Sequence, residues 1–297
     1  MASTANTDPN AATVGAVIIP HYNDTARLDR CLAALGAQDL TAVEVVVVDN
    51  GSTEPLAAVK AAHPFARFVV EPEKGAAAAR NRGVAETTAP GLFFLDADCV
   101  PTSDWLAAAL RATAPGTVTG GRVEVFDETP GPRSGAEAFE TVFAFHQRAY
   151  IEKKGFSVTA NLITTRAVFE ATGPFRAGVS EDLDWCHRAT AAGHRLVYDD
   201  RLTVAHPTRR DLTALLGKWR RMTAETFGLG GGGARARLIW AGRACLMPLS
   251  VLAHAPRVMT HPALASPGER ARALATLARL RLTRSVWMLR QAAGLGL

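Results

Sequence analysis

The chain has 297 residues, of which 48% are hydrophobic, so it can bury one large core or a core with an appendage. Its four cysteines follow no CxxC or paired spacing, which argues against a disulfide framework or a zinc site and favours a reducing compartment. The net charge of +5 is unevenly distributed, because the residues from Arg201 onward include 16 Lys or Arg but 3 Asp or Glu. Such a basic C-terminal part predicts a polyanionic partner: a lipid headgroup surface, a phosphorylated substrate or nucleic acid.

Predicted strands and helices alternate along the first part of the chain. Apolar runs predict buried strands at 14–20, 44–48, 68–70 and 92–95. Helices are predicted at 26–38, 76–88 and 103–111. This alternation with short links is typical of an α/β fold with a mostly parallel, doubly wound sheet and helices on both faces. Later strands are expected at 123–126, 161–165, 196–198 and 202–205, and later helices at 136–152, at 166–172 and from 181.

Carboxylates follow two of the predicted strands. Asp49 comes directly after the strand 44–48, and Asp96 and Asp98 come directly after the strand 92–95. Ligands of open α/β sheets bind at this edge, and two carboxylates there suit Mg²⁺, which proteins hold with one or two carboxylates plus substrate phosphates. A solvated turn is the alternative interpretation of this DxD pattern, because Asp favours turns.

A second acidic group opens the helix predicted from residue 181. Glu181, Asp182 and Asp184 all fall in its first turn, where the helix dipole favours negative charge. That effect explains one or two of the three acids more readily than all three. The pattern leaves two roles open for Glu181 and Asp182, stabilisation of the helix or catalysis.

The C-terminal part is predicted to be a basic, partly apolar helical extension. GLGGGG at 228–233 matches GxGxxG but follows no strand, so it is interpreted as a flexible linker. The apolar stretch 238–255 is interrupted by Arg243, Pro248 and His254, which favours an interfacial or re-entrant segment over a spanning helix. The last helix, 268–291, carries six arginines and few interleaved aromatic residues, so association with a membrane surface is favoured over nucleic acid.

The runs AVIIPHYN, EVVVVDNGS, EKGAAAARNRG, FFLDADC and SEDLDWCHRA, in this order, resemble the family 2 glycosyltransferases of the GT-A fold. The resemblance covers about Val14 to Ala224 and implies a catalytic domain over 14–227, between a disordered tail at 1–13 and the extension at 228–297. It implies a nucleotide-sugar donor, usually a UDP-sugar, together with Mg²⁺ or Mn²⁺. By position, Pro20, Tyr22 and Asn23 would line the nucleotide pocket, Asp49 would bind the base and Arg80 the base or a phosphate.

The same resemblance implies a metal site. Asp98 would ligate the metal that bridges the diphosphate, and Asp96 would lie near the ribose or the metal. His206 matches a histidine that completes the metal shell in many relatives, although an ordinary histidine at a strand end explains it equally well. A cation is chemically reasonable here, because departure of a nucleoside diphosphate develops negative charge.

The resemblance also implies the catalytic base. Asp182 matches the family's base in its Glu-Asp motif, and Glu181 would orient the acceptor or serve as second choice. The acceptor hydroxyl must lose its proton as it attacks, so a positioned carboxylate is required. One displacement with one base inverts the anomeric centre and needs no carboxylate nucleophile.

One departure from the family narrows the prediction. The segment 217–221, GKWRR, lacks the QxxRW motif of processive members, so transfer of one or few sugars is expected. The acceptor is expected to be a hydroxyl of a lipid-linked or cell-envelope glycan, with the enzyme peripheral at the cytoplasmic face of the membrane. The alternatives are a GT-A-like nucleotidyltransferase and a catalytically inactive, membrane-associated scaffold.

Overall fold

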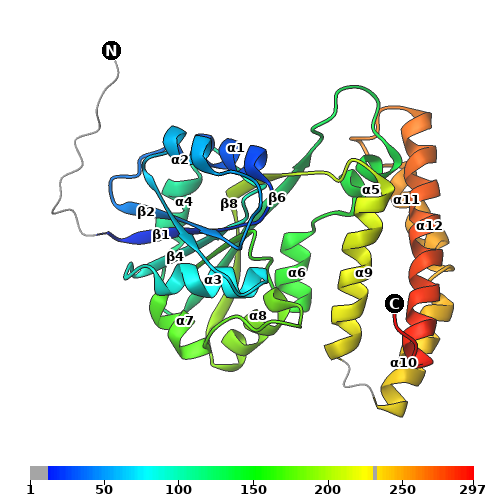
Figure 1. Cartoon of the computed structure of the whole chain (residues 1–297). Coiled ribbons are helices and arrows are strands. Elements are labelled where there is room, and N and C mark those ends of the chain that lie inside the picture. Colours follow the sequence, from blue (N-terminus) through cyan, green and yellow to red (C-terminus); the bar gives the residue numbers. More distant parts are fainter. Residues whose placement is uncertain (1–12, 230–232) are drawn as a thin grey trace. The chain divides into compact units, whose positions relative to one another are not determined.

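The computed structural model describes residues 13–229 and 233–297, and these residues form two compact units (Figure 1). The first unit comprises the described residues up to Glu124, His146–Ala177 and Glu181–His206. The second comprises Val125–Phe145, Gly178–Ser180 and the described residues from Pro207 to Leu297. The predicted tail at 1–13 lies almost wholly outside the described residues, as does most of the predicted linker at 228–233.

An eight-stranded sheet has the strand order β3-β2-β1-β4-β7-β6-β8-β5. Its parallel part contains β1 (Gly15–His21), β2 (Val43–Asp49), β3 (Ala66–Val70) and β4 (Gly91–Leu95). The remaining strands are β5 (Val100–Pro101), β6 (Thr117–Phe126), β7 (Asn161–Thr165) and β8 (Arg195–Pro207). β7 pairs antiparallel with β4 and β6, and β5 pairs antiparallel with β8. The α/β class is confirmed, and the parallel pairing that the alternation predicts joins the first four strands.

Helices cover both faces of this sheet. Figure 1 shows α1 (Thr25–Gly36), α2 (Ala57–Ala62) and α4 (Trp105–Ala112) on one face. The other face carries α3 (Ala76–Ala85), α7 (Arg166–Thr172) and α8 (Glu181–Ala191), and the first unit also contains α6 (Gln147–Lys154). Neighbouring residues of β4 separate the two layers: Phe93 contacts Trp105 of α4, whereas Phe94 contacts Phe169 of α7. Burial on both faces explains why the central strands are continuous apolar runs.

A glycine brings α3 close to the sheet. A Cβ at Gly83 would lie 2.4 Å from Cγ2 of Ile18 on β1 and 3.2 Å from Cγ2 of Val48 on β2, so a larger residue would push the helix away. Arg80, one turn earlier on α3, is therefore held near the end of the strands.

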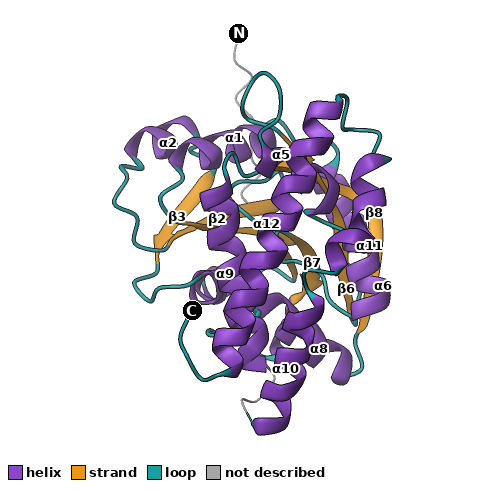
Figure 2. Cartoon of the chain, turned by 90° about the vertical axis from the view of Figure 1, so that its right-hand side faces the viewer, coloured by secondary structure: helices purple, strands orange, loops and turns teal. Residues whose placement is uncertain are grey.

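The second unit is a helical assembly around α12 (Pro267–Ala292), which contacts all four of its other helices. These are α5 (Gly135–Phe143), α9 (Leu212–Leu229), α10 (Ala234–Leu246) and α11 (Ser250–Met259). Figures 1 and 2 show α9 and α12 running side by side. Their core includes Phe139, Leu215, Val258 and Leu277. This unit therefore extends beyond the predicted division at 227/228, because α5 and α9 bury their apolar sides with α11 and α12.

Several element boundaries differ from those expected. The helix predicted at 136–152 is two helices, because α5 buries Phe139 and Val142 in the second unit whereas α6 buries Ile151 in the first. The strands predicted at 196–198 and 202–205 form the single strand β8, and α2 and β5 were not expected. The helix predicted at 103–111 begins at Trp105 in α4, whose N-cap is Asp104.

Within 13–229 and 233–297, no single helix is both long and apolar enough to cross a bilayer. Together α10 and α11 reach the necessary length and composition, but the chain bends by 48° between them. The interfacial or re-entrant role of this stretch stays a prediction.

Candidate active site

The carboxyl ends of β1, β2 and β4 gather the polar residues of the site. The parallel register places His21 at the end of β1 opposite Asp49 at the end of β2. Asp96 directly follows Leu95, the last residue of β4. Since the ends of parallel strands meet at one edge, residues distant in sequence become neighbours there.

His21 orients the carboxylate of Asp49. The backbone N–H of Asp24 donates to Nε2 of His21 at 3.2 Å, so the ring proton lies on Nδ1. Nδ1 is 3.4 Å from Oδ1 of Asp49, and the backbone N–H of Ser52 donates to the same oxygen at 3.2 Å. His21 is buried and Asp49 is half-buried, so Asp49 reaches the surface with its orientation fixed.

Tyr22 and Asn23, both predicted to line a nucleotide pocket, differ in their surroundings. The Tyr22 ring is 55% exposed, and Nζ of Lys74 lies 4.4 Å from its centre. Asn23 has a positive φ of 46°, and its Oδ1 accepts from the backbone N–H of Thr53 at 2.7 Å. Tyr22 therefore offers an aromatic face to a ligand, whereas Asn23 shapes the loop. Pro20 lies half-buried near the end of β1.

Asn50 joins the loops that follow β2 and β3. Its side-chain amide donates to the carbonyl oxygens of Glu71 and Glu73 at 3.0 and 2.6 Å, and its Oδ1 accepts from the backbone N–H of Gly75 at 2.7 Å. Nζ of Lys74 donates in return to the carbonyl oxygens of Asn50 and Gly51, both at 3.0 Å. These bonds fix the backbone immediately before α3.

Arg80 is the buried cation at the centre of the site. It forms ion pairs with Asp96, at 2.6 Å between Nη2 and Oδ1, and with Glu181. Burial by itself lowers the pKa of this guanidinium, but the carboxylates of Asp96, Glu181 and Asp182 raise the pKa above its ordinary value. The Nε of Arg80 is buried without a hydrogen-bond partner. Arg80, predicted to bind base or phosphate, is engaged by three acids of its own chain.

Asp182 has the properties of a general base. Its Oδ1 accepts from the hydroxyl of Thr159 at 2.8 Å. Burial raises the pKa of Asp182 to about 6, against the opposing effect of Arg80 and with a further increase from Glu181. Part of the side chain remains accessible. The third acid of this turn, Asp184, pairs with Arg188 at 2.9 Å and with Arg176 at 3.6 Å, which gives it a structural role.

Asp98 and His206 meet through a short strand pair. β5 pairs with β8 so that Val100 lies opposite Ala205, which brings Nε2 of His206 to 3.1 Å from Oδ2 of Asp98. An imidazole and a carboxylate at this separation suit Mg²⁺ or Mn²⁺ if substrate phosphates supply the other oxygens. Asp96, also predicted as a ligand, forms an ion pair with Arg80 through Oδ1. Across 13–229 and 233–297, no three His, Cys, Asp or Glu side chains converge as a metal site.

Four residues of this edge were not predicted as site residues: His21, Asn50, Lys74 and Thr159. The first three are adjacent to predicted site residues or to the start of α3, so their positions at strand ends are a usable signal. Thr159 precedes β7 and contacts Asp182 across 23 positions of sequence, a relation for which no motif exists.

Charged and polar side chains thus gather at the edge of the sheet where open α/β folds bind their ligands. The model of Glycosyl transferase family 2 matches residues 16–177, and the chain belongs to this family. The chain therefore carries a glycosyltransferase domain with a GT-A fold, followed by a helical C-terminal extension.

Two named relatives have similar sequences. Glycosyltransferase AglE of Haloferax volcanii is 33% identical over 205 residues, which are 65% of this chain and 66% of AglE. The pre-mycofactocin glycosyltransferase of Mycobacterium tuberculosis is 30% identical over 211 residues, 66% of this chain and 43% of that protein. The match spans less than two thirds of either relative.

Two solved structures share the fold. One is the mannosyltransferase PcManGT from Pyrobaculum calidifontis in complex with GDP-Man and Mn²⁺, with a TM-score of 0.54, 20% identity, and coverage of 98% of this chain and 78% of that chain. The other is GalNAc-T7 with UDP, GalNAc and Mn²⁺, with a TM-score of 0.52, 17% identity, and coverage of 69% and 45%. At these identities the likeness concerns the fold.

Proposed function

We propose that this glycosyltransferase inverts the anomeric centre of a sugar that it takes from a nucleoside diphosphate, in a metal-dependent reaction with Asp182 as the base. The observation that carries this proposal is the environment of Asp182: a carboxylate with a pKa of about 6, fixed by Thr159 and near the buried cation Arg80. Above pH 6 it is ionised and accepts the proton of an attacking hydroxyl. A single displacement with this one base inverts the configuration.

The donor is proposed to bind over the ends of β1 and β2. The exposed Tyr22 ring and the oriented carboxylate of Asp49 offer stacking and hydrogen bonding to a nucleobase. The structural neighbours were solved with GDP-Man and with UDP, which supports a nucleoside-diphosphate sugar as the donor class. A UDP-sugar is the first candidate because of the family resemblance.

The donor set of Asp98 and His206 fits Mg²⁺ or Mn²⁺, and the neighbours' Mn²⁺ supports the same class of ion. A cation held there would neutralise the charge that develops on the departing diphosphate. Arg80 pairs with Asp96 and Glu181 and compensates the charge of Asp182, and Glu181 would orient the acceptor.

The acceptor is proposed to be a hydroxyl of a lipid-linked or cell-envelope glycan at the inner face of the cell membrane, receiving one or few sugars. The basic composition from Arg201 onward supports this assignment. Large apolar side chains exposed on α10, α11 and α12 support it as well, including Leu238 and Leu252, each 75% exposed.

Calorimetric titration with UDP, GDP, dTDP and CDP, each with and without Mn²⁺, tests the donor site. One nucleotide is expected to bind in a metal-dependent manner, and Asp98→Ala is expected to abolish the metal dependence. Asp200→Ala is the matched control, because Asp200 is an exposed carboxylate 3.7 Å from Arg148 in a surface ion pair. Binding that Mn²⁺ and Asp98→Ala leave unchanged would remove the metal from the proposal, and no binding at all would favour the inactive scaffold.

A further inference from the structure

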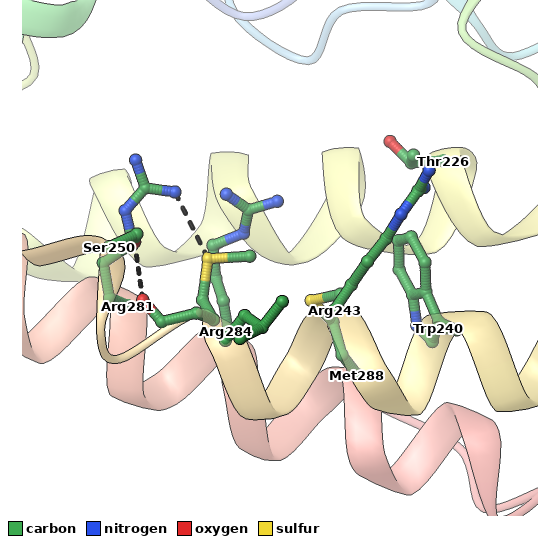
Figure 3. Close-up of a pocket in the computed structure, with 9 residues that line it drawn as sticks. Thr226, Trp240, Arg243, Ser250, Arg281, Arg284 and Met288 are labelled. Carbon is green, nitrogen blue, oxygen red and sulfur yellow. Dashed lines mark hydrogen bonds between the residues drawn. The ribbon is translucent and has the colours of Figure 1, made fainter. Parts of the chain in front are cut away.

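The second unit contains a cavity of about 380 Å³ whose lining comes from α9, α10, α11, α12 and the turn after α10 (Figure 3). Its apolar lining includes Trp240, Leu246, Met247 and Met288. Its polar lining includes three arginines, Arg243, Arg281 and Arg284. The cavity therefore combines positive charge with an apolar wall.

None of these three arginines has an ion-pair partner among the described residues. Nη1 of Arg281 lies 3.3 Å from Sδ of Met247, and its Nε is buried without a hydrogen-bond partner. Nε of Arg284 donates to the hydroxyl of Thr223 at 3.3 Å, and its guanidinium lies 4.3 Å from the centre of the Trp219 ring. These are weak contacts for a cation withdrawn from water.

Some other basic residues of the second unit do form ion pairs with acidic residues. Arg209 and Lys218 both bind Glu140, at 2.9 and 3.0 Å, and Arg133 binds Asp127 at 2.6 Å. The few acids of the second unit are thus used away from the cavity.

Two like charges on one helix face favour an external anion. Arg281 and Arg284 are three positions apart on α12, so they project on the same side and repel each other. Burial lowers the pKa of both guanidinium groups, and the charge of Arg281 further lowers the pKa of Arg284 to about 10, so both remain charged at neutral pH. A phosphate group relieves the repulsion and matches the donor geometry of arginine.

Apolar side chains beside the cavity indicate what carries the phosphate. Leu246 lines the cavity and is 63% exposed. Leu249 adjoins the cavity-lining Ser250 in sequence and is 62% exposed. A water-soluble phosphate gains nothing from these surfaces, whereas an alkyl or isoprenoid chain does.

We propose that this cavity binds the phosphate group of a membrane lipid, with Arg281 and Arg284 as its ligands and Arg243 contributing charge, and with the lipid chain on the exposed apolar side chains. The site is separate in sequence from the residues assigned to the donor. Lipid binding does not depend on the proposed glycosyl transfer, so each proposal can fail without the other.

Co-sedimentation of the full chain with vesicles tests this site. The vesicles contain phosphatidylcholine with either phosphatidic acid, which has a terminal phosphate, or phosphatidylserine at matched surface charge. Stronger binding to phosphatidic acid is expected, and Arg281→Gln/Arg284→Gln is expected to weaken it by about tenfold or more, since charge-assisted hydrogen bonds are lost.

The matched control is Arg235→Gln/Arg279→Gln, which removes the same charge from exposed positions of α10 and α12 that do not line the cavity. It should retain the preference for phosphatidic acid, and both double variants should keep the unfolding temperature of the parent and its binding of nucleotide. Arg281→Lys/Arg284→Lys, which keeps the charge but not the planar donors, should recover part of the affinity.

Three outcomes would overturn the proposal. Equal losses in the two glutamine variants would mean unspecific attraction to an anionic surface. Displacement of the protein from vesicles by glycerol phosphate at concentrations that match the lipid would mean a site for soluble phosphate. A dimer in light scattering that buries the cavity and excludes vesicles would make this face a contact between copies of the chain.

Discussion

Arg80 of the first unit and Arg284 of the second are both withdrawn from water, but their electrostatic surroundings are opposite. Asp96 and Glu181 bind Arg80 directly, and with Asp182 they raise its pKa. Arg284 has a ring and a hydroxyl as neighbours, and burial together with Arg281 lowers its pKa. Around Arg80 the fold itself supplies the anions, whereas none of the described acids forms an ion pair with Arg284. The proposed catalysis and the proposed anion binding rest on this difference.

The largest effect, on the rate of transfer, is expected for Asp182, which lies near Arg80 and accepts a hydrogen bond from Thr159. Asp182→Asn should lower the rate of sugar transfer by about 10²–10⁴-fold, because the amide cannot accept the proton of the acceptor. Steady-state kinetics measures this loss, and nucleotide binding by calorimetry should stay within a factor of two or so of the parent. A variant that retains normal turnover would show that Asp182 is not the base.

Removal of the internal cation should destabilise the first unit. Arg80→Met leaves Asp96, Glu181 and Asp182 without their shared counter-charge, and we expect a loss of about 2–4 kcal/mol in the free energy of unfolding at neutral pH. Urea denaturation followed by circular dichroism measures it. Arg80→Met/Glu181→Gln should recover part of the loss, because one of the uncompensated charges is also removed. An unchanged unfolding midpoint would contradict the buried ion-pair network.

The raised pKa of Asp182 has a consequence for stability. Because its pKa is about 6 in the folded protein and 3.8 ordinarily, the folded state holds the proton more tightly, and stability falls as the pH rises from about 4 to about 6. Asp182→Asn removes this cost and should be more stable than the parent by about 1–3 kcal/mol above pH 6, with no gain below pH 4. Unfolding measured across this pH range decides the sign, and a gain that does not vary with pH would have another cause.

The smallest effect is expected in the second unit. Arg284→Met removes a cation that lacks an acidic partner, so relief of its desolvation should offset the lost contacts with Trp219 and Thr223. The free energy of unfolding should change by less than about 1 kcal/mol, as measured by urea denaturation beside Arg80→Met. A loss as large as that of Arg80→Met would mean that the contacts of Arg284 stabilise the fold as much as the ion pairs of Arg80 do.

The sequence was most informative where burial leaves a local pattern. β1, β2 and β4 are buried on both faces, so their apolar runs identify them and place Asp49, Asp96 and Asp98 at one edge. The strand β8 was harder to recognise, because Asp199 and Asp200 interrupt its apolar residues while the backbone stays extended. The break between α5 and α6 was missed for a related reason, since helical propensity continues through it and only long-range packing divides it.

Partners in the site could not be predicted in the same way. The ion pair of Asp96 with Arg80, 16 residues earlier, and that of Arg80 with Glu181, 101 residues later, were not expected from the sequence. Which of these ion pairs form depends on how closely α3 and α8 approach the sheet. Neither the residue types nor their spacing in the sequence indicates that distance. The family resemblance identified the acidic residues of the site, whereas the structure identified Arg80 as the cation that pairs with Asp96 and Glu181.

The distribution of the four thiols has a practical consequence for spectroscopy. Cys31, Cys99 and Cys186 are buried, and burial raises the pKa of each, that of Cys186 to about 12, so alkylating dyes should react with them slowly in the folded protein. Cys245 is exposed on α10, between the buried Ala244 and the cavity-lining Leu246. The native chain therefore offers one selective labelling position, and an environment-sensitive fluorophore there would report directly on whether α10 enters an apolar phase.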